Sequence, residues 1–548
     1  MQRDWRYAAA VAVLTLIAVV RVASTHRVFS EVLDEPAHVA AGFEWFQGTY
    51  LLDASHPPLA RILGTLPLWS FPLPKAKDLV AYGNELLYHG ERYEKTLARV
   101  RIGNLFLLAI ALIATAAWAR RAFSKSVALL SVALLGTMPA VLGHAGVLTT
   151  DLAALTAITV ALLALDLFLE KPSMKRGAFL GLAVGAGLLA KFSFLVFFPP
   201  CAVIVLLLRG AFHRSHRSHL SYRSHDSNGT NRTYGTYGRN SLIAAAVAFL
   251  VFWGGYRFDF RTPLAYTGPH AVNVFDIAAP EPLRPLARWV AEKLPVPAPA
   301  FWVGLGMLKA HDEEGHTAFL FGEHRDKGWW YYFPVVFFYK SPIPFLLLAA
   351  WGTMLLIRER DRVRLVYPLI PLAIMAVSMT SSINIGVRHI LPLYAPLAIV
   401  AAYAVVEIWR RATDGFARAM LVTLLLWLFG GVAAEHPDYL AWFNEAAQPN
   451  PARIAVDSNL DWGQDTLRLS RVLREMQINR LHVDILTNAR IDGVEAVRFH
   501  AAQKVTGWLA VSETALVLHE RFGEYQWLSA YRPVRRIGKS IRLYYIPE

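Results

Sequence analysis

The sequence contains little cysteine and little charge. Its only cysteine, Cys201, lies inside an apolar run and cannot form an intramolecular disulfide, so any outer segment must be stable without one. Charged residues make up 18% of the 548 residues, against about a quarter in soluble domains. Hydrophobic residues make up 55% of the chain. This composition argues against an ordinary soluble protein and favours a membrane protein.

Apolar runs recur through the first 434 residues. About 20 apolar residues cross a hydrocarbon core of roughly 30 Å. On this basis we predict about eleven membrane helices. They lie near Tyr7–Val22, Ile102–Trp118, Val127–Leu142, Leu152–Leu169, Ala178–Ala190, Phe194–Leu208, Leu242–Tyr256, Pro334–Ile357, Leu365–Met379, Ile390–Val406 and Met420–Ala434. The two runs beside Lys191 are short, which is compatible with a broken or tilted element.

The basic residues predict the orientation. If the N-terminus is cytoplasmic, alternate connections should be rich in Lys and Arg. They are, at Arg120–Lys125, Lys171–Arg176, after Arg209, at Arg358–Arg364 and at Arg410-Arg411. The net charge of +14 is thus spread over inner loops in contact with membrane lipid, and no nucleic-acid partner is expected. No small-residue cleavage site follows the first run, which favours a retained helix over a signal peptide.

Three outer segments are too long to be simple turns: residues 23–100, residues 257–332 and the tail after Glu435. In the first, the acidic pair Asp34-Glu35 precedes Pro36 and His38, and Ser55-His56-Pro57-Pro58-Leu59 follows. A proline at the first helical position predicts a helix directly after the pair, lying along the membrane surface. Taken alone, the pair is explained more simply by helix capping through the carboxylates.

The order of these motifs resembles that of the C-type glycosyltransferases that use lipid-linked sugars, in particular the protein O-mannosyltransferases and the lipid A aminoarabinose transferases. The resemblance covers residues 1–434. Besides the acidic pair and His-Pro-Pro-Leu, it includes Thr149-Thr150-Asp151, Gly187-Leu188-Leu189-Ala190-Lys191 and Gly386-Val387-Arg388-His389-Ile390-Leu391-Pro392. Each motif alone is weak, and the evidence is their order and common sidedness.

The resemblance implies an inverting transfer of a sugar from a polyprenyl-phosphate carrier to a protein, lipid or glycan acceptor at the outer face of a bacterial inner membrane. By the same resemblance, Asp34 is the general base and Glu35 its neighbour or orienting group. Arg388 is the first candidate for the phosphate, with Lys191 and His389 as second choices, His56 as a hydrogen-bond donor and Asp151 as a second acid for acceptor or metal.

Simpler interpretations of these residues stay open. Interfacial Arg388 and Lys191 could extend to lipid headgroups, and Asp151 could cap a helix. His56, where the aminoarabinose transferases have lysine, favours a hexose as the transferred sugar.

Two further stretches carry clustered polar residues. The second outer loop holds His311-Asp312-Glu313-Glu314-Gly315-His316 and His324, which could bind a divalent metal such as zinc or form a solvated, charged loop. No cofactor is certain from the sequence. The inner loop 210–240 repeats Arg-Ser-His units and lacks apolar residues, so we predict disorder.

The tail, residues 435–548, alternates helix and strand patterns. A helix is expected around Leu467–Met476, and strands at Leu481–Leu486, Gly507–Val511 and Ile541–Ile546. The fold class is therefore mainly α, a polytopic membrane protein with a small C-terminal α/β periplasmic domain. The acidic string Asp457–Asp465, DSNLDWGQD, resembles one seen in bacterial members of this glycosyltransferase group, and either an acceptor surface or turns with a helix N-cap explain it.

Two other functional classes fit a polytopic chain. A transporter or lipid flippase usually shows internal repeats and ionisable groups at the membrane midplane. This sequence shows no clear repeat, and its candidate acids lie at the outer boundary. A scaffold that binds partners through its tail would need far fewer membrane helices as an anchor.

Overall fold

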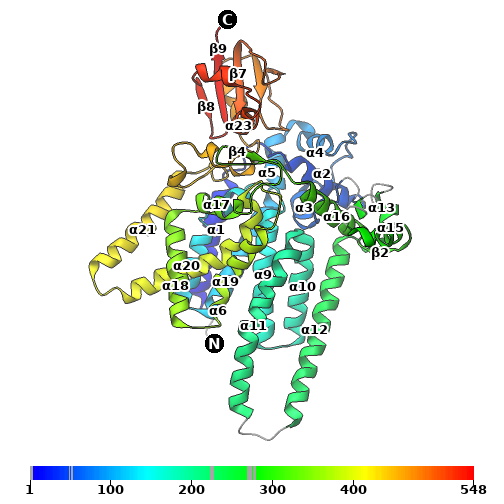
Figure 1. Ribbon diagram of the computed structural model, residues 1–548, viewed down its shortest axis with the longest axis vertical. Helices are drawn as coiled ribbons and strands as arrows, with labels where there is room; N and C mark the ends of the chain where they lie inside the picture. Colours follow the sequence, from blue (N-terminus) through cyan, green and yellow to red (C-terminus); the bar gives the residue numbers. More distant parts are fainter. Residues whose placement is uncertain (1–3, 49, 51–52, 222–226, 268–273, 276–278) are drawn as a thin grey trace.

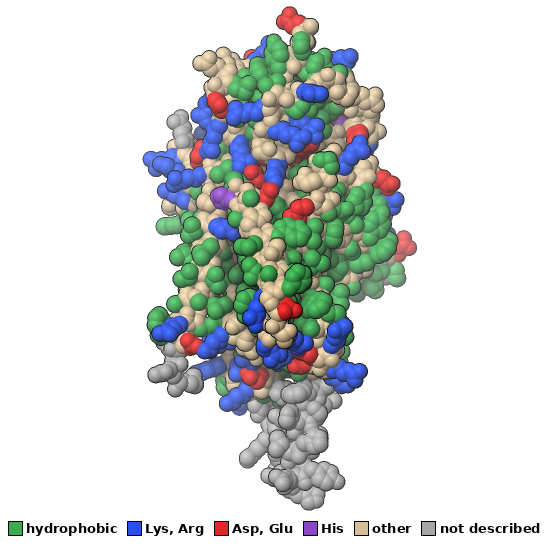
Figure 2. All heavy atoms as spheres, turned by 90° about the vertical axis from the view of Figure 1, so that its left-hand side faces the viewer, with side chains coloured by type: hydrophobic (Ala, Val, Ile, Leu, Met, Phe, Trp, Pro, Cys, Tyr) green, Lys and Arg blue, Asp and Glu red, His purple; other side chains and the backbone are tan. Residues whose placement is uncertain are grey.

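In the computed structural model, long helices run side by side and a C-terminal sheet lies beyond one end of them (Figure 1). The structure describes residues 4–48, 50, 53–221, 227–267, 274–275 and 279–548. We call the end that carries the sheet the outer side, following the orientation predicted from the basic residues. Hydrophobic side chains form a broad band between two zones rich in charged residues (Figure 2), as expected for a protein that crosses a membrane.

Among the described residues, six helical stretches are long and apolar enough to cross a membrane, or up to eight if each of two bent pairs is one span. The six are α1 (Trp5–Ala23), α5–α6 (Tyr93–Val100 and Ile102–Ala122), α9 (Asp151–Glu170), the C-terminal part of α12 (Tyr237–Gly255), η4–α20 (Val387–Leu393 and Tyr394–Arg411) and α21 (Gly415–Ala434). The predicted count of about eleven is therefore not confirmed. Helices occupy every predicted position, but α10 (Met174–Ala190), the apolar part of α11 (Ser193–Arg209) and α19 (Val366–Ser378) are short.

Prolines explain the bent pairs. Helices α7 (Lys125–Leu135) and α8 (Pro139–Ala145) meet at 63°, and α17 (Tyr332–Tyr339) and α18 (Ile343–Glu359) meet at 115°. A proline follows each break, at Pro139 and Pro342, where it disfavours helical backbone in the residue before it. Each pair is predicted from the sequence as a single span. The break expected near Lys191 is present, because this residue is extended between α10 and α11.

Helices α9 and α20 form the centre of the helical core, whereas α12 and α21 are peripheral. Helix α10 approaches α12 closely through three glycines four residues apart. A Cβ atom on Gly177, Gly181 or Gly185 would lie 2.3–2.7 Å from backbone oxygens of α12. Small residues at this spacing allow helix backbones to pack together within a membrane.

The predicted disordered segment 210–240 is helical at both ends. Helix α11 runs from Ser193 to Ser221 and α12 from Ser227 to Gly255, and residues 222–226 lie outside the described residues. Each helix continues from an apolar run, and extending an existing helix costs far less free energy than starting one.

Short elements cover the outer side. The first outer segment forms α2 (Glu35–Phe46), α3 (Leu59–Thr65), α4 (Leu79–Leu87) and α5. The second forms α13 (Pro263–Thr267), α15 (Arg284–Lys293), α16 (Pro299–Glu314) and an antiparallel hairpin of β3 (Ala318–Leu320) and β4 (Glu323–Arg325). Two strands of two residues each, β1 (Phe260–Arg261) and β2 (Val296–Pro297), pair antiparallel and join the start of the second segment to the residues before α16.

The C-terminal sheet has five strands in the order β6-β5-β7-β9-β8. Its elements are α22 (Thr466–Glu475), β5 (Arg480–Asp484), β6 (Glu495–Arg498), β7 (Gly507–Ser512), α23 (Glu513–Glu520), β8 (Arg535–Ile537) and β9 (Ile541–Ile546). Strand β5 is parallel to β6 and β7, and β9 is antiparallel to β7 and β8. The predicted helix and three strands are α22, β5, β7 and β9.

Candidate active site

Asp34 ends the turn between α1 and α2. Helix α2 begins at Glu35 with Pro36 in its first turn, as the sequence predicts. Asp34 occupies the N-cap position, but its side chain makes no capping hydrogen bond. Its Oδ2 instead accepts a hydrogen bond of 3.0 Å from Nη1 of Arg388, and a third of the side chain stays exposed. Capping therefore does not explain this carboxylate.

Arg388 lies in η4, directly before α20. Its Nη1 is 3.0 Å from Asp34 Oδ2 and 3.9 Å from Asp151 Oδ2. The guanidinium carbon lies 4.2 Å from the ring centroid of Trp462, close enough for a cation–π interaction. The side chain is only 11% exposed, so it does not extend to lipid headgroups.

Asp151 begins α9 and is buried. Lys191 Nζ lies 2.5 Å from Asp151 Oδ1, and Thr149 Oγ1 donates to Oδ2 at 2.9 Å. We call Asp34, Asp151, Lys191 and Arg388 the charge cluster. Its two acids and two bases balance, and both oxygens of Asp151 are already occupied. This arrangement favours a role for Asp151 in holding the two cations.

Two histidines named from the sequence lie near the charge cluster. His56 packs edge-on against His38, with ring centroids 5.0 Å apart, and its Nδ1 lies 2.8 Å from Ser55 Oγ. Burial, reinforced by the Arg61 charge, lowers the pKa of His56 to about 4, so the ring is neutral at pH 7. His389 interacts electrostatically with Lys191, Arg388 and Asp151.

Glu35 has surroundings quite different from those of Asp34. Its carboxylate is fully buried and accepts hydrogen bonds from Arg101 Nε and Nη2, at 2.9 and 2.7 Å. The backbone N–H groups of Val32 and Leu148 donate to it as well, at 2.9 and 2.7 Å. These four bonds leave Glu35 as a residue that positions the start of α2 rather than one open to a substrate.

The acidic string of the tail packs against η4, a contact that the sequence did not predict. Asn459 Oδ1 accepts a hydrogen bond from the Val387 backbone N–H at 3.0 Å, and Ser458 Oγ donates to the Ile385 carbonyl at 2.7 Å. Trp462, from the same string, lies against the Arg388 guanidinium. The string therefore holds Arg388 in place from both its backbone and its side chain. The density of polar residues in the string was a signal that it makes specific contacts, but the sequence did not indicate that η4 is its partner.

Lys340 ties the same string to the membrane helices. Its buried Nζ donates to the carbonyls of Leu440 and Asn459, at 2.8 and 2.6 Å, at the break between α17 and α18. Arg61 has a similar role in the first outer segment: it donates to His38 Nδ1 at 3.0 Å and to the Tyr50 hydroxyl at 2.8 Å. Neither residue was named from the sequence.

The histidines of the second outer loop do not gather. His311 and His316 have ring centroids 5.7 Å apart, while His324 packs on Phe319. Across the described part of the chain, no group of three or more His, Cys, Asp or Glu side chains is placed to hold a metal ion.

One family model and several solved structures match this chain. The family model for dolichyl-phosphate-mannose-protein mannosyltransferases matches residues 93–223, and no curated protein matches. A crystal structure of ArnT from Cupriavidus metallidurans bound to undecaprenyl phosphate has 12% identity and a TM-score of 0.48, with 97% of each chain covered. The oligosaccharyltransferase of Archaeoglobus fulgidus, tethered with an acceptor peptide, has 12% identity and a TM-score of 0.41, covering 79% of this chain and 55% of that one.

The two structural likenesses, with TM-scores below 0.5, support no argument on function. The family match does, within its range, which contains Asp151 and Lys191 of the charge cluster. The resemblance of this chain to the C-type membrane glycosyltransferases is thereby confirmed over residues 93–223.

Proposed function

We propose that the protein is a membrane glycosyltransferase that moves a sugar, in our preferred assignment a hexose, from a polyprenyl-phosphate carrier to an acceptor hydroxyl. The observation that carries the proposal is the Asp34–Arg388 pair. A carboxylate that caps no helix and stays one-third exposed is held against an arginine whose other neighbour is the Asp151–Lys191 ion pair.

The charge cluster can perform the chemistry of such a transfer. The acceptor oxygen attacks the anomeric carbon from the face opposite the phosphate, which inverts that centre. Its proton passes to Asp34 while the bond from the anomeric carbon to the phosphate oxygen breaks. The leaving polyprenyl phosphate gains a negative charge, which Arg388 and Lys191 are placed to stabilise.

An exchange of partners follows from the same geometry. The guanidinium of Arg388 can grip two phosphate oxygens at once. When it turns from Asp34 to the donor phosphate, the Asp34 oxygen is free to accept the acceptor's proton. The buried Asp151 keeps both cations close together while the donor enters, because each basic group repels the other without it.

The test is transfer from a panel of polyprenyl-phosphate sugars to a panel of acceptors by the purified protein, with products identified by mass. Asp34→Asn should lower kcat about a hundredfold to ten-thousandfold, the usual contribution of a general base. Asp78→Asn is the matched control in the same outer segment. Asp78 caps α4 by accepting from the Val80 and Ala81 N–H groups, and asparagine caps equally well.

Asparagine at position 34 keeps an oxygen for Arg388, so the variant should stay folded, which its elution profile and melting temperature would verify. A folded Asp34→Asn protein with full activity would refute the assignment of the base. Absence of any sugar transfer by the native protein across the donor panel would refute the proposed function itself.

A further inference from the structure

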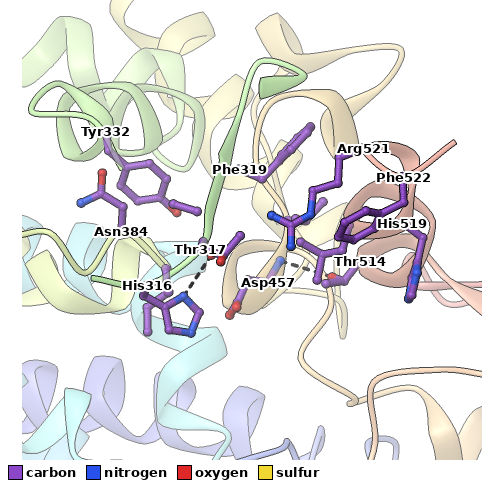
Figure 3. Close-up of a pocket in the computed structure, with 14 residues that line it drawn as sticks. His316, Thr317, Phe319, Tyr332, Asn384, Asp457, Thr514, His519, Arg521 and Phe522 are labelled. Atoms are coloured by element: carbon purple, nitrogen blue, oxygen red, sulfur yellow. Dashed lines mark hydrogen bonds between the residues drawn. The ribbon is translucent and has the colours of Figure 1, made fainter. Parts of the chain in front are cut away.

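A cavity of about 350 Å³ lies between the second outer loop and the C-terminal sheet region, outside the charge cluster. Figure 3 shows that its walls come from separate parts of the chain: the segment leading into the β3–β4 hairpin, the turn at Asp457, and α23 with the residues after it. We call it the outer pocket. Its volume lies within the roughly 300–1,000 Å³ of small-molecule sites.

Asp457 is the acidic group of the outer pocket. It has a φ of 58°, in the left-handed region that side chains other than glycine rarely adopt, so the surrounding structure must hold it there. The Thr514 hydroxyl accepts its backbone N–H at 3.2 Å, and the Ser458 N–H donates to its carboxylate. Within the described part of the chain, no lysine, arginine or histidine lies within 4.0 Å of this carboxylate. A strained backbone thus presents a carboxylate that makes no direct ion pair with the described residues, and the Arg388 charge acts on it from beyond that distance.

The other walls combine aromatic rings with hydrogen-bonding groups. Phe319 and Phe522 supply ring faces, and His316 and His519 supply polar atoms (Figure 3). Aromatic rings pack well on the apolar C–H faces of sugar rings, while carboxylate oxygens accept hydrogen bonds from hydroxyls. Peptides, by contrast, are commonly recognised along an open sheet edge or a groove, which this compact cavity does not provide.

The outer pocket lies beside the charge cluster. Arg388 interacts electrostatically with Asp457 as well as with Asp34 and Asp151. The residues that follow Asp457 in the chain, Ser458 and Asn459, hydrogen-bond to the backbone of Ile385 and Val387, just before Arg388. Burial raises the pKa of Asp457, and the Arg388 charge opposes this rise, so the two groups sense each other.

We propose that the outer pocket is the acceptor subsite and that it takes a saccharide, with Asp457 accepting a hydrogen bond from a ring hydroxyl. The inference rests on the proposed function in calling the bound saccharide the acceptor. Occupation of the pocket by a saccharide is separate from transfer and can be measured without it.

The binding test uses protection of a cysteine at the mouth of the pocket. Cys201 is buried, so Phe522→Cys, at a position that is 64% exposed, introduces a distinct accessible thiol. The probes are neutral di- and trisaccharides of glucose, mannose and N-acetylglucosamine, with a serine-rich hexapeptide for comparison. Val534→Cys, also exposed and not part of the pocket, is the matched control.

Saccharide should slow maleimide labelling of the Phe522→Cys protein and leave labelling of the Val534→Cys protein unchanged. Adding Asp457→Asn should weaken protection about tenfold, because it replaces a charged acceptor by a neutral one. Asparagine tolerates the left-handed backbone, so this variant is expected to fold. Protection by the hexapeptide alone, by no probe, or equally with and without Asp457→Asn would each overturn the proposal.

Kinetics separate this inference from the proposed function. Asp457→Asn should raise the KM for the acceptor about tenfold, a larger change than that in the KM for the donor. Asp34→Asn should lose transfer and the slow hydrolysis of the donor by water together. Saccharide protection without any sugar transfer would refute the proposed function and keep a saccharide site, whereas transfer with an unchanged acceptor KM in Asp457→Asn would refute the acceptor subsite alone.

Discussion

Replacing Glu35 should destabilise the protein without removing its chemistry. The Glu35 and Arg101 side chains are both fully buried and joined by two hydrogen bonds, of 2.9 and 2.7 Å. Loss of one partner leaves a buried charge uncompensated, which costs about 3–5 kcal/mol. Glu35 also satisfies two backbone N–H groups, and each one left unpaired costs about 1–3 kcal/mol, so we expect the upper part of the range for Glu35→Ala.

A double-mutant cycle isolates the pair. Glu35→Ala and Arg101→Ala should each lower the free energy of unfolding by about 3–5 kcal/mol. The double variant Glu35→Ala with Arg101→Ala should cost less than the sum of the single changes, because no unpaired charge remains, with a coupling of about 0.5–3 kcal/mol. The measurement is reversible unfolding by sodium dodecyl sulfate in mixed micelles.

Glu94→Ala is the matched control in the same outer segment. Its partner Arg471 is 3.2 Å away, but both side chains are more than 40% exposed, so the loss should stay within about 1 kcal/mol. Additive single and double changes, or a loss below that of the control, would refute the stability argument. A Glu35→Gln protein of normal stability that has lost sugar transfer would refute the purely positioning role.

Two further changes test the first outer segment. Arg61 is buried and pairs with Asp53 while donating to His38, so Arg61→Met should lower the free energy of unfolding by about 3–5 kcal/mol. Arg61→Lys should restore little of this stability, because lysine lacks the forked donors of the guanidinium. Melting temperatures and protease cleavage rates of both variants check this; full rescue by lysine would contradict it. Burial raises the pKa of Glu31 to about 8. Below about pH 4.5 the side chain is protonated in both the folded and the unfolded protein, so its burial then leaves no charge without solvent. As pH rises from there through about 8, stability falls by up to about 1.4 kcal/mol per pH unit, because the unfolded protein loses the proton first. The melting temperature of Glu31→Gln minus that of the native protein should therefore rise between pH 5 and 8, and a flat difference would contradict the shift.

Local sequence signals predicted the elements whose causes are local. Pro36 directly after an acidic pair predicted the start of α2, and short strand-like runs predicted β5, β7 and β9. Strands β6 and β8 were missed because they are edge strands, short and mostly exposed, with no buried face to produce a periodic pattern. Hydropathy located the membrane helices but could not count spans, since Pro139 and Pro342 bend helices that composition alone reads as straight.

Parts of the candidate site were identifiable as residues but not as pairs. The motifs placed Asp34, Asp151, Lys191 and Arg388 on one side of the membrane. The Asp34–Arg388 hydrogen bond joins residues 354 positions apart, and no periodicity encodes such a pairing. The two carboxylates of the acidic pair could not be told apart from sequence either, since only packing buries Glu35 against Arg101 and leaves Asp34 open.

The position of Arg388 explains why the tail and the membrane helices form one site. In the proposed transfer, the Arg388 guanidinium leaves Asp34 for a phosphate, which needs a backbone that stays fixed while the charged end moves. The tail supplies this through Asn459 and Ser458, which hydrogen-bond to the backbone of Val387 and Ile385, just before Arg388, while the Trp462 ring lies against the guanidinium without competing for its hydrogen bonds. The same turn carries Asp457 into the outer pocket. A change in the tail that shifts this turn would therefore alter Arg388 and the proposed acceptor contact together, which in the proposed transfer couples the two substrates through three consecutive residues.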